Sequence, residues 1–563
     1  MNQLPGSDTF SSRFNKRGLK TFLYFLLLIL ILYLPFIDKA YHIDDSEFIN
    51  MSGMIGWNPL HATPIDYQYN GMLLKGALPP YEMTHPLLVP YLIKIFSALF
   101  GQSEVSLHLS FMIFVVMTLA SLLLINRALF PEDNGSGKVA ALFLLAAPAF
   151  LVNSQDLMTD VPTLALLLCS VACYCHFVET GRPLSAYIGG GFLTLAAFTS
   201  YQSLLFSVIL FIYLAAKRRV DIRSAVTLVL PWVMLFVWFL LVYQTHGIFP
   251  FFNRGGESSS VNVVSVGLSF QRLLVKFITF LSFTGSSLLF LVPAYLFFAR
   301  SIIRFLVIIV PSLVILFFTI PFVADYPLFP RLFLALLASL GFFALTEAFF
   351  KCAEEYRNSR FKGRSLFLMT WIIICVVYTV AVYPWMAARY VLPILPPVIM
   401  ILARGFTFSG TVKKKIVVAV AALLSVFFGF ASAYSDYKYA DSYRELAQAL
   451  KQPASEGKVW FIGKWGMQYY LQKVGAHYLL ADDNSPVRGD IVVIPDMPNF
   501  WTPSPSLQYR LVPFAQKKMI SPLPLRLFNA RSRAGFYTTN FGLLPFAISR
   551  EPDEVFLFLR VFR

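Results

Sequence analysis

The chain has 563 residues, of which 57% are hydrophobic and only 13% are charged. Soluble domains carry about 25% charged residues, so this composition excludes an ordinary soluble protein and indicates a polytopic membrane protein. The net charge of +16 comes largely from basic clusters between apolar runs, so it does not indicate a nucleic-acid partner.

The first predicted transmembrane helix covers residues 19–37 and follows a polar, basic segment. Its length suits a bilayer crossing, whereas a signal peptide has a shorter apolar core and a small-residue cleavage site. Because Arg13, Lys16 and Arg17 precede it and Lys20 lies at its start, we expect an uncleaved helix whose N-terminus lies in the cytoplasm.

Further apolar runs predict about thirteen transmembrane helices in total. They cover residues 105–127, 138–152, 159–178, 184–199, 202–216, 224–243, 272–298, 302–322, 329–350, 366–383, 389–403 and 414–433. The basic clusters at 217–223, 351–364 and 411–415 all fall on the cytoplasmic side of this arrangement. An odd number of spans places the first outer loop, 38–104, the loop 244–271 and the C-terminal tail on the outer face.

The tail, residues 436–563, is too polar to span a membrane and predicts a small α/β domain after a transmembrane domain of residues 1–435. Residues 441–450 have the pattern of an amphipathic helix. Short β-strands are predicted at 458–463, 477–482, 490–495, 535–541 and 554–562.

Ionisable side chains near membrane depth are costly, so those on the predicted outer face are candidates for function. These candidates are Asp44, Asp45, Glu47, Asp66, Glu82, His85, Asp156, Asp160, Asp325, Arg331 and Arg389. Each also has a structural interpretation. Asp160 fits a helix N-cap, His85 fits the start of the following helical segment, and Arg331 and Arg389 fit interfacial anchors.

Four motifs, in order along the chain, resemble those of GT-C-fold membrane glycosyltransferases of the protein mannosyltransferase and lipid A aminoarabinose transferase type. The first outer loop opens with the acidic pair Asp44–Asp45 and continues to "HPLLVPYL" at 85–92, where Leu87 stands in place of the usual second proline. "TDVPT" at 159–163 opens the fourth span, and "RYVLPILP" at 389–396 opens a late span. The resemblance covers roughly residues 20–435.

The resemblance implies an inverting transfer of a sugar from a polyprenyl-phosphate donor to lipid A, a protein or another envelope glycan. Asp44 would act as catalytic base, with Asp45 and Asp160 beside it. Arg389, Tyr390, Arg331 and a protonated His85 would bind the donor phosphate and its lipid. Glu47 and Asp156 would bind sugar or acceptor hydroxyls.

We expect no obligatory cofactor, although an Asp-Asp-x-Glu cluster is also suited to a divalent metal ion. The alternatives from other classes are a transporter or flippase for a lipid-linked sugar and a non-catalytic scaffold. A transporter predicts inverted repeats and charged, broken helices at the membrane midplane, whereas the acids here cluster near one interface. The five cysteines imply no disulfide framework, and the expected location is a bacterial inner membrane with an outward-facing site.

Overall fold

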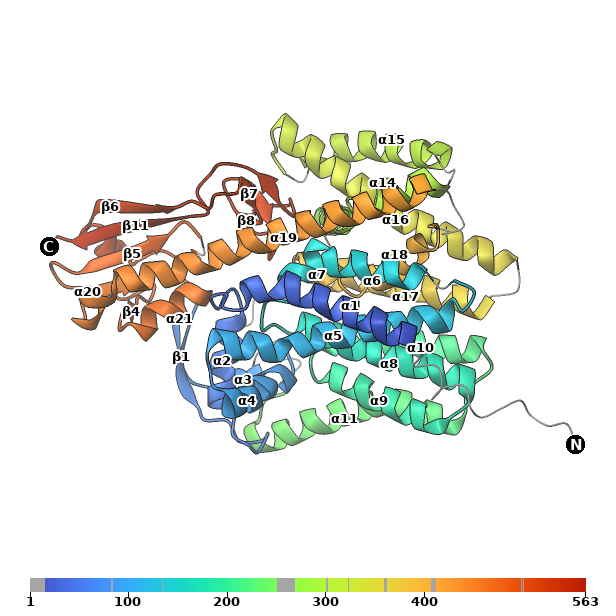
Figure 1. Ribbon diagram of the computed structural model, residues 1–563. Coiled ribbons are helices and arrows are strands. Elements are labelled where there is room, and N and C mark those ends of the chain that lie inside the picture. The colour runs from blue at the N-terminus through green and yellow to red at the C-terminus, as the bar shows by residue number, and fades with distance from the viewer. Residues whose placement is uncertain are drawn as a thin grey trace, which may run out of the picture.

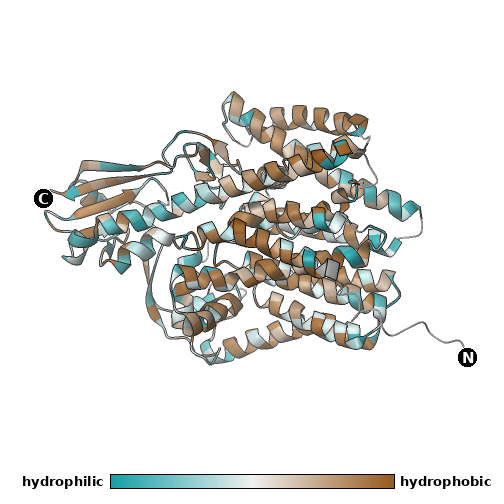
Figure 2. Ribbon diagram, viewed as in Figure 1, coloured by the Kyte–Doolittle hydropathy of each residue, from teal (hydrophilic) through white to brown (hydrophobic). Residues whose placement is uncertain are grey.

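The computed structural model describes residues 16–82, 85–133, 135–250, 269–299, 302–322, 324–358, 362–406, 412–497, 499 and 501–562. A helical bundle forms most of the molecule, and an α/β domain projects from one end of it (Figure 1). Apolar residues dominate the bundle, while polar residues are frequent in the projecting domain (Figure 2). The predicted fold class, a polytopic α-helical membrane protein with a small C-terminal α/β domain, is confirmed. Residues 251–268 of the predicted loop 244–271 lie outside the described residues.

Eight helices in the described ranges are long and apolar enough to cross a membrane. They are α1 (Lys16–Tyr33), α5 (Glu104–Leu129), α8 (Asp160–Thr180), α11 (Ile222–His246), α15 (Ile302–Thr319), α16 (Leu328–Arg357), α17 (Lys362–Val382) and α19 (Val412–Ala449). The pair α13 (Phe270–Ser287) and α14 (Leu291–Ala299), bent by 71°, makes up to nine if it counts as one broken span.

The other predicted spans correspond to shorter helices. Residues 138–152 form α6 (Ser136–Ala146) and α7 (Pro148–Asn153), divided where Pro148 cannot continue the first helix. Residues 184–199 form α9 (Pro183–Ala197), and 202–216 form η2 (Tyr201–Leu204) with α10 (Leu205–Ala216). Residues 389–403 form the 3-10 turn η4 (Ala388–Val391) and α18 (Leu395–Ala403). The count of thirteen crossings therefore stays a prediction.

Helices α13 and α16 approach each other closely through two glycines. A Cβ atom on Gly285 would overlap the backbone carbonyl of Leu337, and one on Gly341 would overlap that of Leu281. Small residues at such a crossing let two backbones pack directly, which is a common way to join membrane helices.

The segment 38–104, which the sequence predicts to be the first outer loop and which keeps that name here, is folded rather than irregular. It contains α2 (Asp45–Met54), the hairpin β1 (Ile65–Tyr69) and β2 (Met72–Ala77), α3 (Pro79–Glu82) and α4 (Leu88–Phe100). The hairpin turns through Asn70 and Gly71, both with positive φ, as two-residue hairpin turns require.

The C-terminal domain begins inside α19, whose 38 residues continue from the bundle into the domain. The predicted boundary at residue 435 therefore falls within one helix. After α20 (Lys451–Ser455), the domain contains β3 (Val459–Phe461), α21 (Trp465–Lys473), β4 (His477–Tyr478), β5 (Ile491–Pro495), α22 (Pro505–Gln508), β6 (Leu511–Met519) and β11 (Glu554–Val561). The five-stranded sheet has the order β4-β3-β5-β11-β6, with β3, β4 and β5 parallel and β11 antiparallel to its neighbours.

A connection between β6 and β11, residues 521–549, packs on the bundle, and we call it the docking segment. It contains only two-residue strands, β7 (Leu525–Arg526) with β10 (Ala547–Ile548) and β8 (Phe528–Asn529) with β9 (Ala534–Gly535). The strand predicted at 535–541 is therefore wrong. Its backbone bonds to the bundle instead, because Ala388 N–H donates to Phe536 O at 2.8 Å and Thr539 N–H donates to Met386 O at 3.0 Å.

Candidate active site

Three predicted residues from distant parts of the chain meet at the bundle end that carries the C-terminal domain. Asp44 is the N-cap of α2, Asp160 begins α8, and Arg389 lies in η4. Arg389 Nη2 lies 3.5 Å from Asp44 Oδ2, and Arg389 Nε lies 3.6 Å from Asp160 Oδ2. The Asp44 side chain is 29% exposed, against 12% for Asp160 and 10% for Arg389, so Asp44 is the group most open to an incoming hydroxyl.

Aromatic rings and backbone contacts hold Arg389 in place. Its guanidinium carbon lies 5.3 Å from the ring centroid of Tyr390, and that ring stacks on Tyr383 with centroids 3.8 Å apart. Lys276 from α13 donates to the carbonyl of Tyr383 at 2.9 Å, and the docking segment bonds to neighbouring Ala388. The arginine therefore sits on a supported turn, as a residue that must present its fork in one orientation requires.

Glu47 lies one turn after Asp44 on α2 and pairs with a residue that the sequence did not single out. Lys464 Nζ, from the C-terminal domain, lies 3.0 Å from Glu47 Oε1 and 4.0 Å from the ring centroid of Tyr69. Burial raises the pKa of Glu47, and Lys464 opposes that rise. Burial alone lowers the pKa of Lys464, but Glu47, Tyr69 and Asp44 together raise it above its usual value.

Asp45 is buried beside Asp44 but makes different contacts. Its Oδ2 accepts a hydrogen bond from His42 N–H at 3.0 Å, and its Oδ1 accepts one from Leu157 N–H at 2.7 Å. These bonds tie the start of α2 to the connection before α8. Burial raises the pKa of Asp45 well above its ordinary value, with Asp156 adding to the rise and Lys39 opposing it.

Asp156 belongs to a buried cluster around Lys39, a second residue that the sequence did not single out. Lys39 Nζ lies 2.5 Å from Asp156 Oδ1 and 2.5 Å from Asp436 Oδ2, and none of the three side chains is more than 1% exposed. Tyr537 of the docking segment donates to Asp156 Oδ2 at 3.3 Å. Burial raises the pKa of Asp156 to about 7, although Lys39 lowers it. The sequence contains one indication of this role. Lys39 closely follows the first predicted span, on the predicted outer face, where Lys and Arg are scarce.

The remaining two residues predicted to bind the donor, His85 and Arg331, lie against aromatic rings. The His85 ring lies 6.0 Å, between centroids, from Phe48 on α2. Arg331, in the first turn of α16, lies 4.9 Å from the ring centroid of Phe317 on α15. Within the described ranges, Arg331 makes no ion pair with Asp44 or Asp160.

No group of three or more His, Cys, Asp or Glu side chains suited to a metal ion occurs among the residues that the structure describes. Asp44 and Asp160 both face Arg389, so the guanidinium supplies the positive charge between them. Whether this site binds a divalent metal ion therefore remains a prediction from the sequence.

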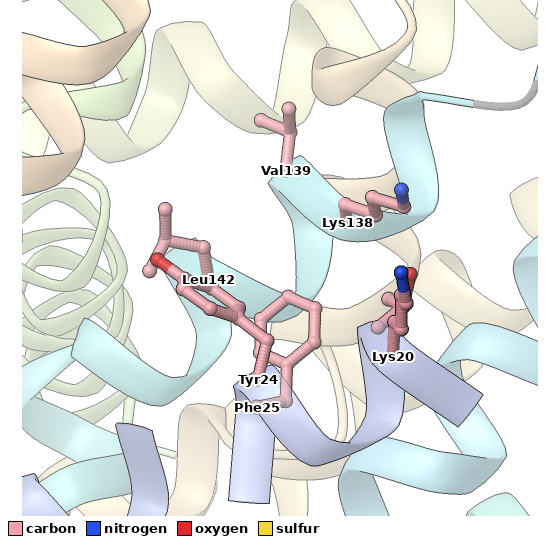
Figure 3. Close-up of a pocket in the computed structure, with 7 residues that line it drawn as sticks. Lys20, Tyr24, Phe25, Lys138, Val139 and Leu142 are labelled. Carbon is pink, nitrogen blue, oxygen red and sulfur yellow. The ribbon is translucent and has the colours of Figure 1, made fainter. Parts of the chain in front are cut away.

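A cavity of about 310 Å³ lies elsewhere, between the beginnings of α1 and α6 (Figure 3). Lys20 and Lys138 line it together with Thr21, Tyr24, Phe25, Val139 and Leu142. Its lining contains no carboxylate, so it offers no base for a transfer reaction.

Residues 84–248 match the family model described as dolichyl-phosphate-mannose-protein mannosyltransferase. The chain resembles that family over this region. The matched range includes the motifs at 85–92 and 159–163 but neither Asp44 nor Arg389. The predicted resemblance is confirmed, and the match supports a membrane glycosyltransferase in general terms.

Several solved structures are distantly similar in shape. ArnT from Cupriavidus metallidurans bound to undecaprenyl phosphate is 13% identical, with 96% of this chain and 98% of that chain covered and a TM-score of 0.42. AglB from Archaeoglobus fulgidus, in complex with an inhibitory peptide and a dolichol-phosphate, is 14% identical over 82% of this chain and 64% of that one, with a TM-score of 0.44. Arabinofuranosyltransferase AftD from Mycobacteria is 12% identical over 97% and 40%, with a TM-score of 0.41. A comparison with curated protein sequences gives no match.

Proposed function

We propose that the protein is an inverting glycosyltransferase that moves a sugar from a polyprenyl-phosphate donor to a hydroxyl-bearing envelope acceptor. The observation that carries the proposal is the convergence of Asp44, Asp160 and Arg389 at one end of the bundle. A single displacement at an anomeric carbon uses a base for the acceptor hydroxyl and a cation for the leaving phosphate, and Asp44 and Arg389 are such groups within ion-pair distance of each other.

In this reaction Asp44 takes the proton of the acceptor hydroxyl. The acceptor oxygen forms a bond to the anomeric carbon as the bond from that carbon to the phosphate oxygen breaks, and the polyprenyl phosphate leaves with the bonding electrons. One displacement of this kind inverts the configuration of the anomeric carbon.

Arg389 is suited to the charge that develops on the leaving phosphate. Its contacts to the two carboxylates, 3.5 and 3.6 Å, are longer than direct charge-assisted hydrogen bonds of about 2.7–2.9 Å. A guanidinium has five N–H donors, so these contacts leave donors for a phosphate. Asp160 and Glu47 would accept hydrogen bonds from sugar or acceptor hydroxyls, and Tyr390 would pack against the donor.

A lipid-linked donor fits a site at the end of a membrane bundle, because such a donor is delivered from the bilayer. We propose a bacterial inner membrane with this end outward, away from cytoplasmic nucleotide sugars. Lipid A, a protein hydroxyl and another envelope glycan are the acceptor candidates. Asp45 and Asp156 would act by holding the outer loop and the α7–α8 connection in place.

The test uses purified protein in proteoliposomes with a radiolabelled polyprenyl-phosphate sugar and an envelope acceptor fraction. The proposal predicts label in the acceptor, none from a nucleotide sugar, and the opposite anomeric configuration in the product. Movement of the labelled lipid between leaflets without transfer would instead support the flippase alternative.

A further inference from the structure

The C-terminal domain contacts the first outer loop, which carries the candidate base Asp44. The β1–β2 hairpin bonds to this domain, because Gly71 N–H donates to Tyr478 Oη at 3.1 Å and Ala481 N–H donates to Gly71 O at 2.8 Å. Lys464 reaches Glu47 from the same domain. The domain therefore fixes the loop that carries Asp44 through both backbone and charge contacts.

The backbone around Lys464 is tightly constrained. Gly463 has φ +148°, and Trp465 has φ +62°, an unusual conformation for a residue with a side chain. A Cβ on Gly466 would overlap the carbonyl of Tyr41, so the turn lies directly against the first outer loop. Trp465 is buried and packs on Phe528, with ring centroids 5.8 Å apart. This packing aims Lys464 at a fixed position.

Local helix stability does not account for a lysine here. Lys464 is the N-cap residue of α21 and makes no side-chain cap hydrogen bond. The N-terminus of a helix favours negative charge and short polar side chains, so a cation at this position is unfavourable for α21. Its stabilising partner is Glu47, on the other domain.

We propose that Lys464 is a positioning residue of the transfer site, which fixes the Glu47 carboxylate beside Asp44 so that it accepts hydrogen bonds from substrate hydroxyls. This inference rests on the proposed function. It makes the C-terminal domain part of the site, because that domain supplies the lysine. Each of the two carboxylates then has a cation beside it: Arg389 contacts Asp44, and Lys464 contacts Glu47.

The pair has a definite consequence for protonation. Burial raises the pKa of Glu47 and Asp44 adds to the rise, while Lys464 opposes both. Without the lysine, Glu47 would take up a proton at higher pH. A protonated Glu47 would donate a hydrogen bond where the substrate hydroxyl needs an acceptor.

The experiment compares Lys464→Met, Lys464→Arg, Glu47→Gln and the double variant Lys464→Met/Glu47→Gln. Lys458→Met is the matched control, since its side chain is exposed in the same domain. Two readouts are used: transfer activity across pH, and labelling of Glu47 by a hydrophobic carbodiimide, which reacts with protonated carboxyl groups, located by mass spectrometry.

We expect Lys464→Met to lower kcat/KM about tenfold or more and to shift the labelling midpoint of Glu47 to higher pH. Lys464→Arg should retain the wild-type midpoint, and Lys458→Met should match wild type in both readouts. In the Glu47→Gln background, Lys464→Met should add no further loss of activity. Fully additive losses, or an unchanged labelling midpoint in Lys464→Met, would overturn the proposal.

The labelling readout needs no activity, so it tests Lys464 even if wild-type protein transfers no sugar and the proposed function fails. If Lys464→Met does not fold, Lys464→Arg and the double variant Lys464→Met/Glu47→Gln test the proposal instead. Lys464→Arg with a shifted midpoint would count against the proposal. Recovery of folding in the double variant would support it.

Discussion

Replacing Lys39 by methionine removes the cation from a cluster of buried carboxylates and is expected to destabilise the protein by about 3–5 kcal/mol. The magnitude follows from the contacts: Lys39 Nζ lies 2.5 Å from carboxylate oxygens of both Asp156 and Asp436, and at most 1% of any of these side chains is exposed. A methionine fills a similar volume, so the loss reports the unpaired charges and not a cavity.

The loss should grow with pH. Burial raises the pKa of Asp156 from 3.8 to about 7 on folding, so this group's contribution to stability falls as pH rises between those values. Without Lys39 the pKa of Asp156 rises further, so the pH range over which this group's contribution to stability falls extends above 7. The free energy of unfolding of Lys39→Met should therefore lie further below wild type at pH 8 than at pH 6.

The assay is equilibrium chemical unfolding in detergent, followed by tryptophan fluorescence. Lys458→Met serves as the exposed control, and Lys39→Met/Asp156→Asn should recover part of the loss because one unpaired charge is removed. A Lys39→Met protein as stable as Lys458→Met at pH 8 would refute the reasoning.

Other substitutions test separate parts of the structure. Arg389→Ala should weaken use of the polyprenyl-phosphate donor by tenfold or more, and Arg389→Lys should restore only part, because an ammonium lacks the forked donors; steady-state kinetics check this. Burial raises the pKa of Glu554 to about 8, so its contribution to stability falls as pH rises from 4.5 to about 8. Glu554→Gln should flatten that pH dependence in an unfolding titration. Gly285→Ala should reduce folded protein because its Cβ would overlap the carbonyl of Leu337, whereas Gly191→Ala, with open space around it, should not; size-exclusion chromatography distinguishes them.

Local sequence patterns predicted where the helices lie and which residues form the Asp44–Arg389–Asp160 group. Apolar runs specify membrane helices without reference to the rest of the chain. Asp160 and Arg389 begin such runs, and Asp44 lies in the loop after the first one. The basic clusters and the odd number of predicted spans placed these residues on one face, and the resemblance to a known family agreed with that prediction. Lengths were less predictable, since proline breaks such as that at Pro148 shorten helices inside an apolar run.

The features that the sequence did not predict depend on tertiary contacts between segments that are far apart in the chain. Lys464 and Lys39 acquire their partners only when the C-terminal domain packs on the first outer loop and the α7–α8 connection. Strand β6 was missed because it contains Pro513, which is tolerated there because β6 is an edge strand with an irregular register opposite β11. Residues 536–541 have the β-branched and aromatic composition of a strand, but Phe536 and Thr539 bond to the bundle and only Gly535 pairs with another strand.

The most direct test of the central claim is the transfer rate of Asp44→Asn. Asparagine keeps the size of the side chain but cannot take the acceptor proton. Purified wild-type and variant proteins would be reconstituted and given a radiolabelled polyprenyl-phosphate sugar. Asp66→Asn is the control, because the structure places this candidate in the β1–β2 hairpin, where its side chain is exposed and its Oδ1 accepts a hydrogen bond from Gly76 N–H.

The account predicts that Asp44→Asn lowers turnover by about 10²–10⁴-fold while donor binding is largely kept, and that Asp66→Asn transfers at the wild-type rate. Asp160→Asn should mainly raise the KM for donor or acceptor. Near wild-type turnover of Asp44→Asn would contradict the assignment of the base, and full activity of both Asp44→Asn and Asp160→Asn would contradict the mechanism itself.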